Sequence, residues 1–158
     1  YIIKGILFLL KLYKFISLVI IRNILIGIFD FEIYKNIIIN KLDVYVLGFK
    51  ILGEKNLIMF YIEKDLLSYN LVIKCIKFML IFKYNGFIFF VYNFSGFDVY
   101  YLLKILIEYN EKNNNYFILK FYFRIGKIIK LKIGFKLFKI NIIYIIFVDS
   151  YFLLNKSL

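Results

Sequence analysis

Three carboxylates, Asp30, Glu32 and Asp98, stand where this sequence could carry out chemistry. Asp30 and Glu32 interrupt residues 23–34, whose nearly continuous apolarity is typical of a strand buried on both faces. Residues two apart on a strand point to the same side, so these two acids should stand side by side, with Phe31 packed on the other side. Asp98 follows a second apolar run and begins a segment of helical spacing, where α/β folds place reactive groups.

These carboxylates have apolar neighbours, and no cation closely precedes Asp30 or Asp98. No Lys or Arg lies within four residues upstream of Asp30 or Asp98. An ionised carboxylate in such a setting is costly unless it is paired or bound to a metal. Hard oxygen ligands suit Mg²⁺ or Mn²⁺, and a pair of such ions can activate water and stabilise the leaving oxygen in phosphodiester cleavage.

Each acidic segment also has a simpler explanation when it is taken alone. An Asp-x-Glu on a strand is more often a pair of solvated side chains. The turn before Asp98 is more often a helix start, in which the carboxylate accepts hydrogen bonds from backbone N–H groups. The order, context and separation of the two segments favour the joint metal site.

The composition excludes several other kinds of site. The chain has no His and a single cysteine, Cys75, which rules out an internal disulfide, the usual zinc sites and any Ser–His or Cys–His nucleophile. Cys75 is expected in the core or on a helix surface. Any catalysis must therefore depend on carboxylates.

The amino-acid usage is biased toward residues with AT-rich codons, as in organelle genomes. The 158 residues include no Pro and carry a net charge of +12, and 63% of them are hydrophobic. Because the lysines partly follow the codon bias, the charge is weak support for a nucleic-acid partner. The longest run without a charge, residues 84–97, has 14 residues, whereas a membrane span needs roughly 18. We expect no membrane span.

The hydrophobic periodicity predicts one α/β domain with a mixed sheet. The expected strands cover residues 23–34, 43–51, 57–62, 87–92, 116–124, 128–138 and 140–148; the first three form an antiparallel meander, and 116–138 a hairpin. The expected helices run from Asp65 or Ser68 to about residue 82, and from Asp98 to about residue 109.

The two acidic segments resemble a known family. Phe29-Asp30-Phe31-Glu32 is similar to the first exonuclease motif of family B DNA polymerases, and Asn93-Phe94-Ser95-Gly96-Phe97-Asp98 to the second. The closest resemblance is to the protein-primed branch of phages and of mitochondrial linear plasmids. The segment from Val148 to Leu158 also resembles that branch, so the similarity covers about residues 23–158.

This resemblance implies a ribonuclease-H-like exonuclease domain with a mixed sheet over residues 23–158, incomplete at its C-terminus, and an N-terminal extension over residues 1–22. It implies these residue roles: Asp30, Glu32 and Asp98 as catalytic ligands of two Mg²⁺ (or Mn²⁺) ions, Asn93 and Phe97 as contacts to the frayed primer end, and Ser157 and Leu158 as the start of a single-strand-binding motif.

The resemblance further implies DNA, as a single-stranded primer 3′ end, for a partner. The full-length enzyme would add dNTPs and a terminal protein, and its expected localisation is mitochondrial. Tyr92 stands where many relatives have His, and stacking can be done by either ring. The chain begins with Tyr and contains neither the third exonuclease motif nor the polymerase motifs. We therefore expect a fragment with no polymerase activity and little or no exonuclease activity by itself.

Two alternatives stay open from the sequence. The first is an organelle-encoded structural or membrane protein with incidental acids, although such a protein should not place acids inside its most apolar runs. The second is a basic nucleic-acid-binding protein, which would need its lysines in one patch. Lysines are densest in residues 127–139, either as a solvated strand face or as a DNA-backbone contact whose binding weakens with salt.

Overall fold

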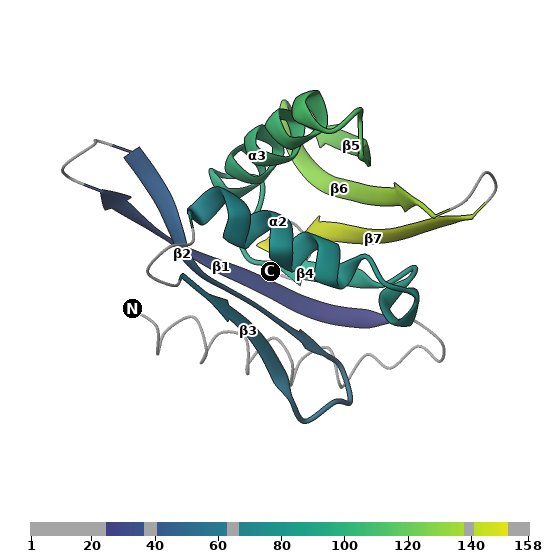
Figure 1. The fold of residues 1–158 in the computed structure, drawn as a ribbon. Coiled ribbons are helices and arrows are strands. Elements are labelled where there is room, and N and C mark those ends of the chain that lie inside the picture. Colours follow the sequence, from purple (N-terminus) through teal and green to yellow (C-terminus); the bar gives the residue numbers. More distant parts are fainter. Residues whose placement is uncertain (1–24, 37–40, 63–66, 138–140, 152–158) are drawn as a thin grey trace.

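A mixed seven-stranded sheet forms the centre of the molecule (Figure 1). The computed structural model describes residues 25–36, 41–62, 67–137 and 141–151. The strands are β1 (Ile26–Asn36), β2 (Lys41–Ile51), β3 (Leu57–Tyr61), β4 (Ile88–Val91), β5 (Phe117–Arg124), β6 (Lys127–Lys136) and β7 (Ile142–Asp149). Their order across the sheet is β3-β2-β1-β4-β7-β6-β5.

Three parallel strands occupy the middle of the sheet. β1 pairs with β4, and β4 with β7, in parallel. Antiparallel meanders flank them, with β2 and β3 beside β1, and β6 and β5 beside β7. The prediction of an α/β fold with a mixed sheet is confirmed. Because β1, β4 and β7 run the same way, their carboxyl ends lie along one edge of the sheet.

Two helices, α2 (Ser68–Met79) and α3 (Asp98–Lys112), cover one face of this sheet (Figure 1). Their buried residues recur at helical spacing, as in Leu71, Val72, Cys75 and Ile76 of α2. Cys75 is fully buried in the core, and burial raises the pKa of its thiol. The prediction of a core or helix-surface position for Cys75 is confirmed.

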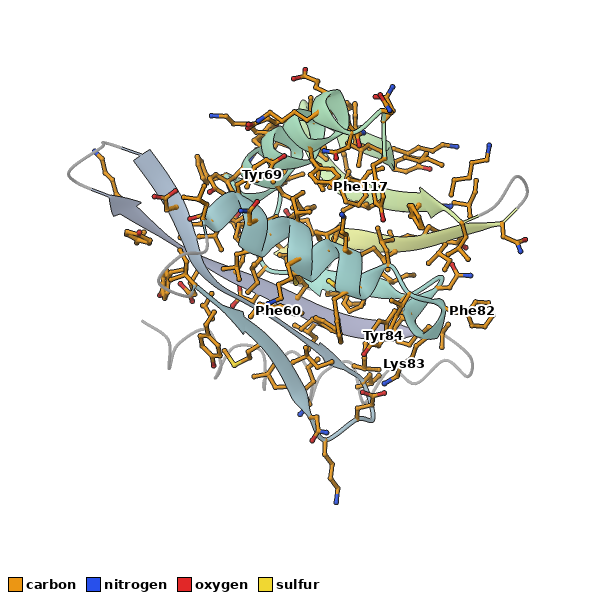
Figure 2. The ribbon with its side chains drawn as sticks, viewed as in Figure 1. Phe60, Tyr69, Phe82, Lys83, Tyr84 and Phe117 are labelled. Carbon is orange, nitrogen blue, oxygen red and sulfur yellow. The ribbon has the colours of Figure 1, made fainter. Side chains whose placement is uncertain are left out.

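Aromatic side chains fill much of the space between helices and sheet. Tyr84 lies buried beyond the end of α2, with its ring centroid 5.3 Å from that of Phe49 (Figure 2). Phe82, two residues earlier, is 85% exposed and points away from the body (Figure 2). The edge-to-face geometry of the first pair adds to the stabilisation from buried area.

The helix boundaries differ from the predictions in two places. Leu67 is the residue before α2, and no side chain caps that end, so a capping role for Ser68 is wrong; Ser68 is buried in the first turn. The other candidate, Asp65, lies outside the described residues. α2 ends at Met79, and a short 3₁₀ helix, Phe82–Tyr84, follows where continuation of the helix was expected.

Within the described part of the chain, no helix is long and apolar enough to cross a membrane.

Candidate active site

The first strand carries two acids on the face away from the helices. Phe29 and Phe31 are buried in the core, while Asp30 and Glu32, which alternate with them, are partly exposed on the opposite face. A β-bulge lies between Glu32 and Ile33 in the pairing with β2. Bulges bend a strand and re-aim its side chains, and they recur next to active sites. The predicted pairing of Asp30 with Glu32 on one face agrees with this arrangement.

Asp98 is the first residue of α3, directly after the turn that follows β4. Its pKa is raised to about 7, first by burial and then by the negative charges of Asp30, Glu32 and Asp149. Carboxylates that are separated by many residues in the sequence therefore share one electrostatic environment. We call the group Asp30, Glu32, Asp98 and Asp149 the acidic edge.

Asp30 shows the same effect more weakly. Its pKa is raised to about 6 by burial and by the charge of Glu32, and a hydrogen bond donated by its neighbour Phe31 N–H to Oδ1, at 3.0 Å, acts in the opposite direction. Among the described residues, no Lys or Arg forms an ion pair with Asp30, Glu32 or Asp98. The acidic edge thus lacks an internal counter-charge from that part of the protein.

Asp98 does not cap the helix, which was the simpler explanation of its position. The residue before α3 is Phe97, in a helical conformation, and no side chain caps this end by a hydrogen bond. Asp98 itself lies inside the first turn. A negative charge there is still favoured by the helix dipole, which does not compensate for its burial beside three other acids.

Asp149 is the member of the acidic edge that the sequence analysis did not assign to the site. It ends β7, opposite Val91 of β4, and is only 1% exposed. Ser95 N–H donates to its Oδ2 at 2.6 Å, and Tyr151 N–H donates to its Oδ1 at 2.9 Å. Asp149 thereby fixes the turn that leads to Asp98. Its position at the end of an apolar strand is the one sign of this role in the sequence. Local patterns do not reveal that this strand lies beside β4.

The turn between β4 and α3 presents exposed side chains close to the acidic edge. Asn93 adopts a left-handed conformation, with φ of 50°, and is exposed. Phe97 is 50% exposed, and Tyr92, 48% exposed, has its ring centroid 6.4 Å from that of Tyr151. Asn93 and Phe97 therefore lie where a ligand could reach them. Ser157 and Leu158 lie outside the described residues.

The chemistry of the acidic edge fits divalent metal ions. Its donors are carboxylate oxygens, which Mg²⁺ and Mn²⁺ prefer, and a cation would offset the repulsion that raises the pKa values of Asp30 and Asp98. Among the described residues, no three or more His, Cys, Asp or Glu side chains already surround a common point as a metal cage.

A curated relative shares part of this sequence. The chain is 35% identical over 105 residues to a probable DNA polymerase of Podospora anserina, in a match that covers 59% of this chain and 9% of that protein. Solved structures of phi29 DNA polymerase have the same fold. The resemblance to the protein-primed family B DNA polymerases is confirmed.

Two of these polymerase structures illustrate the match. Phi29 DNA polymerase complexed with single-stranded DNA superposes with a TM-score of 0.52, and its orthorhombic crystal form with 0.53. Each match has 13% identity and covers 81% of this chain and 21% of the polymerase chain. The ribonuclease-H-like α/β fold expected from the resemblance is likewise confirmed. No protein-family model matches the chain.

Proposed function

We propose that this chain forms part of the 3′→5′ proofreading exonuclease of a protein-primed DNA polymerase. The observation that carries the proposal is the meeting of Asp30, Glu32 and Asp98, from β1 and the start of α3, in one partly buried and mutually repelling group. Such groups are typical of sites that hold catalytic metals. Because the chain spans about 9% of its curated relative and 21% of the structural ones, the activity of the whole enzyme belongs to the proposal.

Asp30, Glu32 and Asp98 would hold two Mg²⁺ or Mn²⁺ ions. When bound, such ions activate water and stabilise the leaving oxygen of the phosphodiester. The side chains themselves must be ionised to act as ligands. With a pKa of about 7, Asp98 would release a proton as metal binds, so metal affinity should rise with pH through neutrality.

The exposed turn before α3 would hold the single-stranded 3′ end. The Phe97 and Tyr92 rings can stack on bases, and the Asn93 amide can donate and accept hydrogen bonds. Ser157 and Leu158 would begin a single-strand-binding motif. The full-length enzyme would be mitochondrial, with dNTPs and a terminal protein as further partners.

The test is to measure Mn²⁺ binding by the 158-residue chain with electron paramagnetic resonance. Asp98→Asn should weaken Mn²⁺ binding at least tenfold, because a ligand and a negative charge are lost. Glu111→Gln is the matched control, since it removes the same charge from an exposed position near the other end of α3. Equal affinity in the two variants would rule out Asp98 as a metal ligand.

A nuclease assay adds a second readout. The chain alone should degrade single-stranded DNA slowly or not at all with Mg²⁺. If it does degrade DNA, and Asp30→Ala abolishes the reaction, the expectation of an inactive fragment is wrong and the assignment of the acidic edge is supported.

A further inference from the structure

The three strands at one side of the sheet carry cations and, before Asp149, no acids. Their charged residues are Lys120, Arg124, Lys127, Lys130, Lys132 and Lys136. Lys130 and Lys132 alternate with the buried Leu131 and Ile133, so they lie on the sheet face opposite the helices. The part of this face that belongs to β5, β6 and β7 is therefore positively charged.

Two of these lysines form a directly opposed pair. Lys120 of β5 pairs with Lys132 of β6 in the antiparallel ladder. Like charges in such a pair are destabilising, and the strands supply no carboxylate between them. The Lys132 ammonium instead lies over the ring of Tyr144, 3.5 Å from its centroid. Two lysines paired on neighbouring strands, with no acid on β5, β6 or β7 before Asp149, offer a site for an anion.

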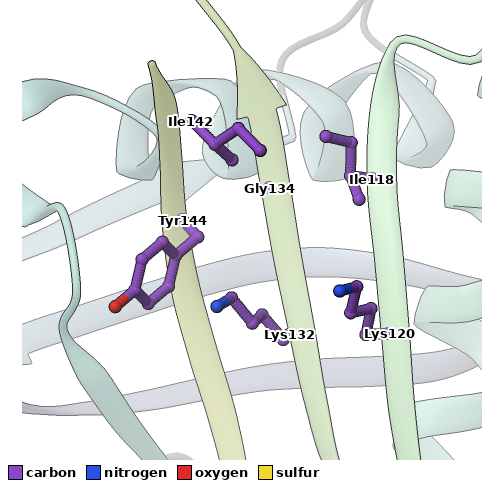
Figure 3. Close-up of a pocket in the computed structure, with 6 residues that line it drawn as sticks. All are labelled: Ile118, Lys120, Lys132, Gly134, Ile142 and Tyr144. Carbon is purple, nitrogen blue, oxygen red and sulfur yellow. The ribbon is translucent and has the colours of Figure 1, made fainter. Parts of the chain in front are cut away.

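The paired lysines border a hollow in the surface of the sheet. Ile118, Lys120, Lys132, Gly134, Ile142 and Tyr144 line this space of about 200 Å³, which we call the basic hollow (Figure 3). Both ammonium groups point the same way along the sheet, with the Tyr144 ring beyond Lys132 (Figure 3). Gly134 leaves the floor open, because an added Cβ would lie 3.3 Å from Ile142 Cγ2.

The basic hollow lies on the sheet face that also carries Asp30 and Glu32. Strand pairing joins one residue from each of five strands, from β5 to β1, into a row across the sheet: Tyr122, Lys130, Val148, Phe90 and Ile28. Paired residues of neighbouring strands point to the same side. Asp30 follows Ile28 on that side of β1, and Lys132 follows Lys130 on that side of β6.

We propose that the basic hollow binds one nucleotide of single-stranded DNA, with a phosphate between Lys120 and Lys132 and the base against Tyr144, Ile118 and Ile142. The hollow combines two cations with apolar and aromatic walls, which matches a nucleotide better than an inorganic anion or an acidic peptide. Its volume is below the ~300–1,000 Å³ of drug-sized sites, so it suits a single base. The choice of DNA rests on the proposed function, whereas the nucleotide chemistry rests on the hollow itself.

The experiment is fluorescence anisotropy of a labelled oligothymidylate with the 158-residue chain in EDTA. The double variant Lys120→Gln/Lys132→Gln should lower affinity at least tenfold and flatten the slope of log affinity against log salt by about 0.7, the value for one phosphate contact on a single strand. Lys74→Gln/Lys104→Gln, exposed on the helices, is the control of equal charge and should change affinity less than threefold. Equal losses in the two double variants would overturn the proposal.

Two further variants test the hollow without changing its charge. Gly134→Ala fills the floor and Tyr144→Ala removes the stacking surface, and each should weaken binding about fivefold or more. Unchanged binding by both would overturn the placement of the base. A tenfold preference for oligouridylate over the DNA oligomer would overturn DNA as the ligand.

This assay needs neither a metal nor Asp98. If the lysine double variant binds oligothymidylate as well as its control does, while Asp98→Asn still weakens Mn²⁺ binding, the basic hollow is not a nucleotide site and the proposed exonuclease stands. If the lysine double variant loses oligothymidylate affinity but Asp98→Asn binds Mn²⁺ as well as its control does, the metal site is wrong and the nucleotide-binding hollow stands.

Discussion

The acidic edge and the basic hollow belong to the same sheet but differ in the sign of their charges and in how deeply those charges are buried. In the acidic edge, Asp149 is buried and the carboxylates of β1 and the start of α3 are partly buried, and the pKa values of Asp30 and Asp98 rise. In the basic hollow, Lys120 and Lys132 stand at the surface beside Tyr144. Both groups hold like charges close together without an opposite charge from the described residues.

The difference follows from strand direction. The acidic edge lies where parallel strands end together, so side chains from distant segments converge at partly buried positions. The basic hollow lies on the open face of an antiparallel meander, where alternate residues face water. Repulsion is therefore costly in the first region and mild in the second.

The largest effect on the free energy of unfolding should come from Asp149, which accepts two backbone hydrogen bonds at the acidic edge. Asp149→Ala leaves the N–H groups of Ser95 and Tyr151 without their acceptor and should cost about 2–4 kcal/mol of unfolding free energy. Urea denaturation measures this loss. Asp149→Asn keeps one acceptor oxygen and should cost less, so an equal loss in both variants would show that the negative charge, rather than the hydrogen bonding, matters.

Removing a repelled carboxylate should stabilise the protein. Asp30→Asn should raise the unfolding free energy at pH 8 by up to about 3 kcal/mol, since a pKa rise from 3.8 to about 6 corresponds to that upper limit. The gain should disappear at about pH 3, where the folded and unfolded forms both largely keep the proton. Glu111→Gln, on the exposed side of α3, should show no such pH dependence.

The pH profile of the unmodified chain should carry the same signature. Asp98 ionises near pH 3.8 in the unfolded state and near pH 7 in the folded state, so stability from this group falls as pH rises between these values. Mn²⁺ at a fixed concentration, a hundred times its dissociation constant at pH 8, should restore about 2.7 kcal/mol at that pH and less at pH 5. Thermal unfolding at pH 5 and pH 8 checks this, and equal metal stabilisation at both pH values would contradict it.

The smallest effect should come from the basic hollow. Lys120→Glu places an acid opposite Lys132 and should stabilise the sheet by about 0.2–1 kcal/mol while it abolishes oligothymidylate binding. Lys74→Glu on α2 is the control with the same charge change. Destabilisation by Lys120→Glu but not by the control would mean that the opposed lysines do not repel each other appreciably.

Local patterns in the sequence were sufficient for much of the fold. Apolar runs located all seven strands of the described chain, and the break after β4 located the start of α3 at Asp98. The side-by-side placement of Asp30 and Glu32 followed from the two-residue period of a strand. The motif resemblance then suggested which distant acid would join them.

Only the tertiary structure decided which strands are neighbours and what the carboxylates experience. The insertion of β7 between β4 and β6 brings Asp149 to Ser95, 54 residues away, and that pairing leaves no trace in local periodicity. The raised pKa values and the opposed Lys120 and Lys132 likewise depend on burial and register. Sequence periodicity determines which side of its own strand a residue takes, whereas charge–charge distance depends on how separate strands pair.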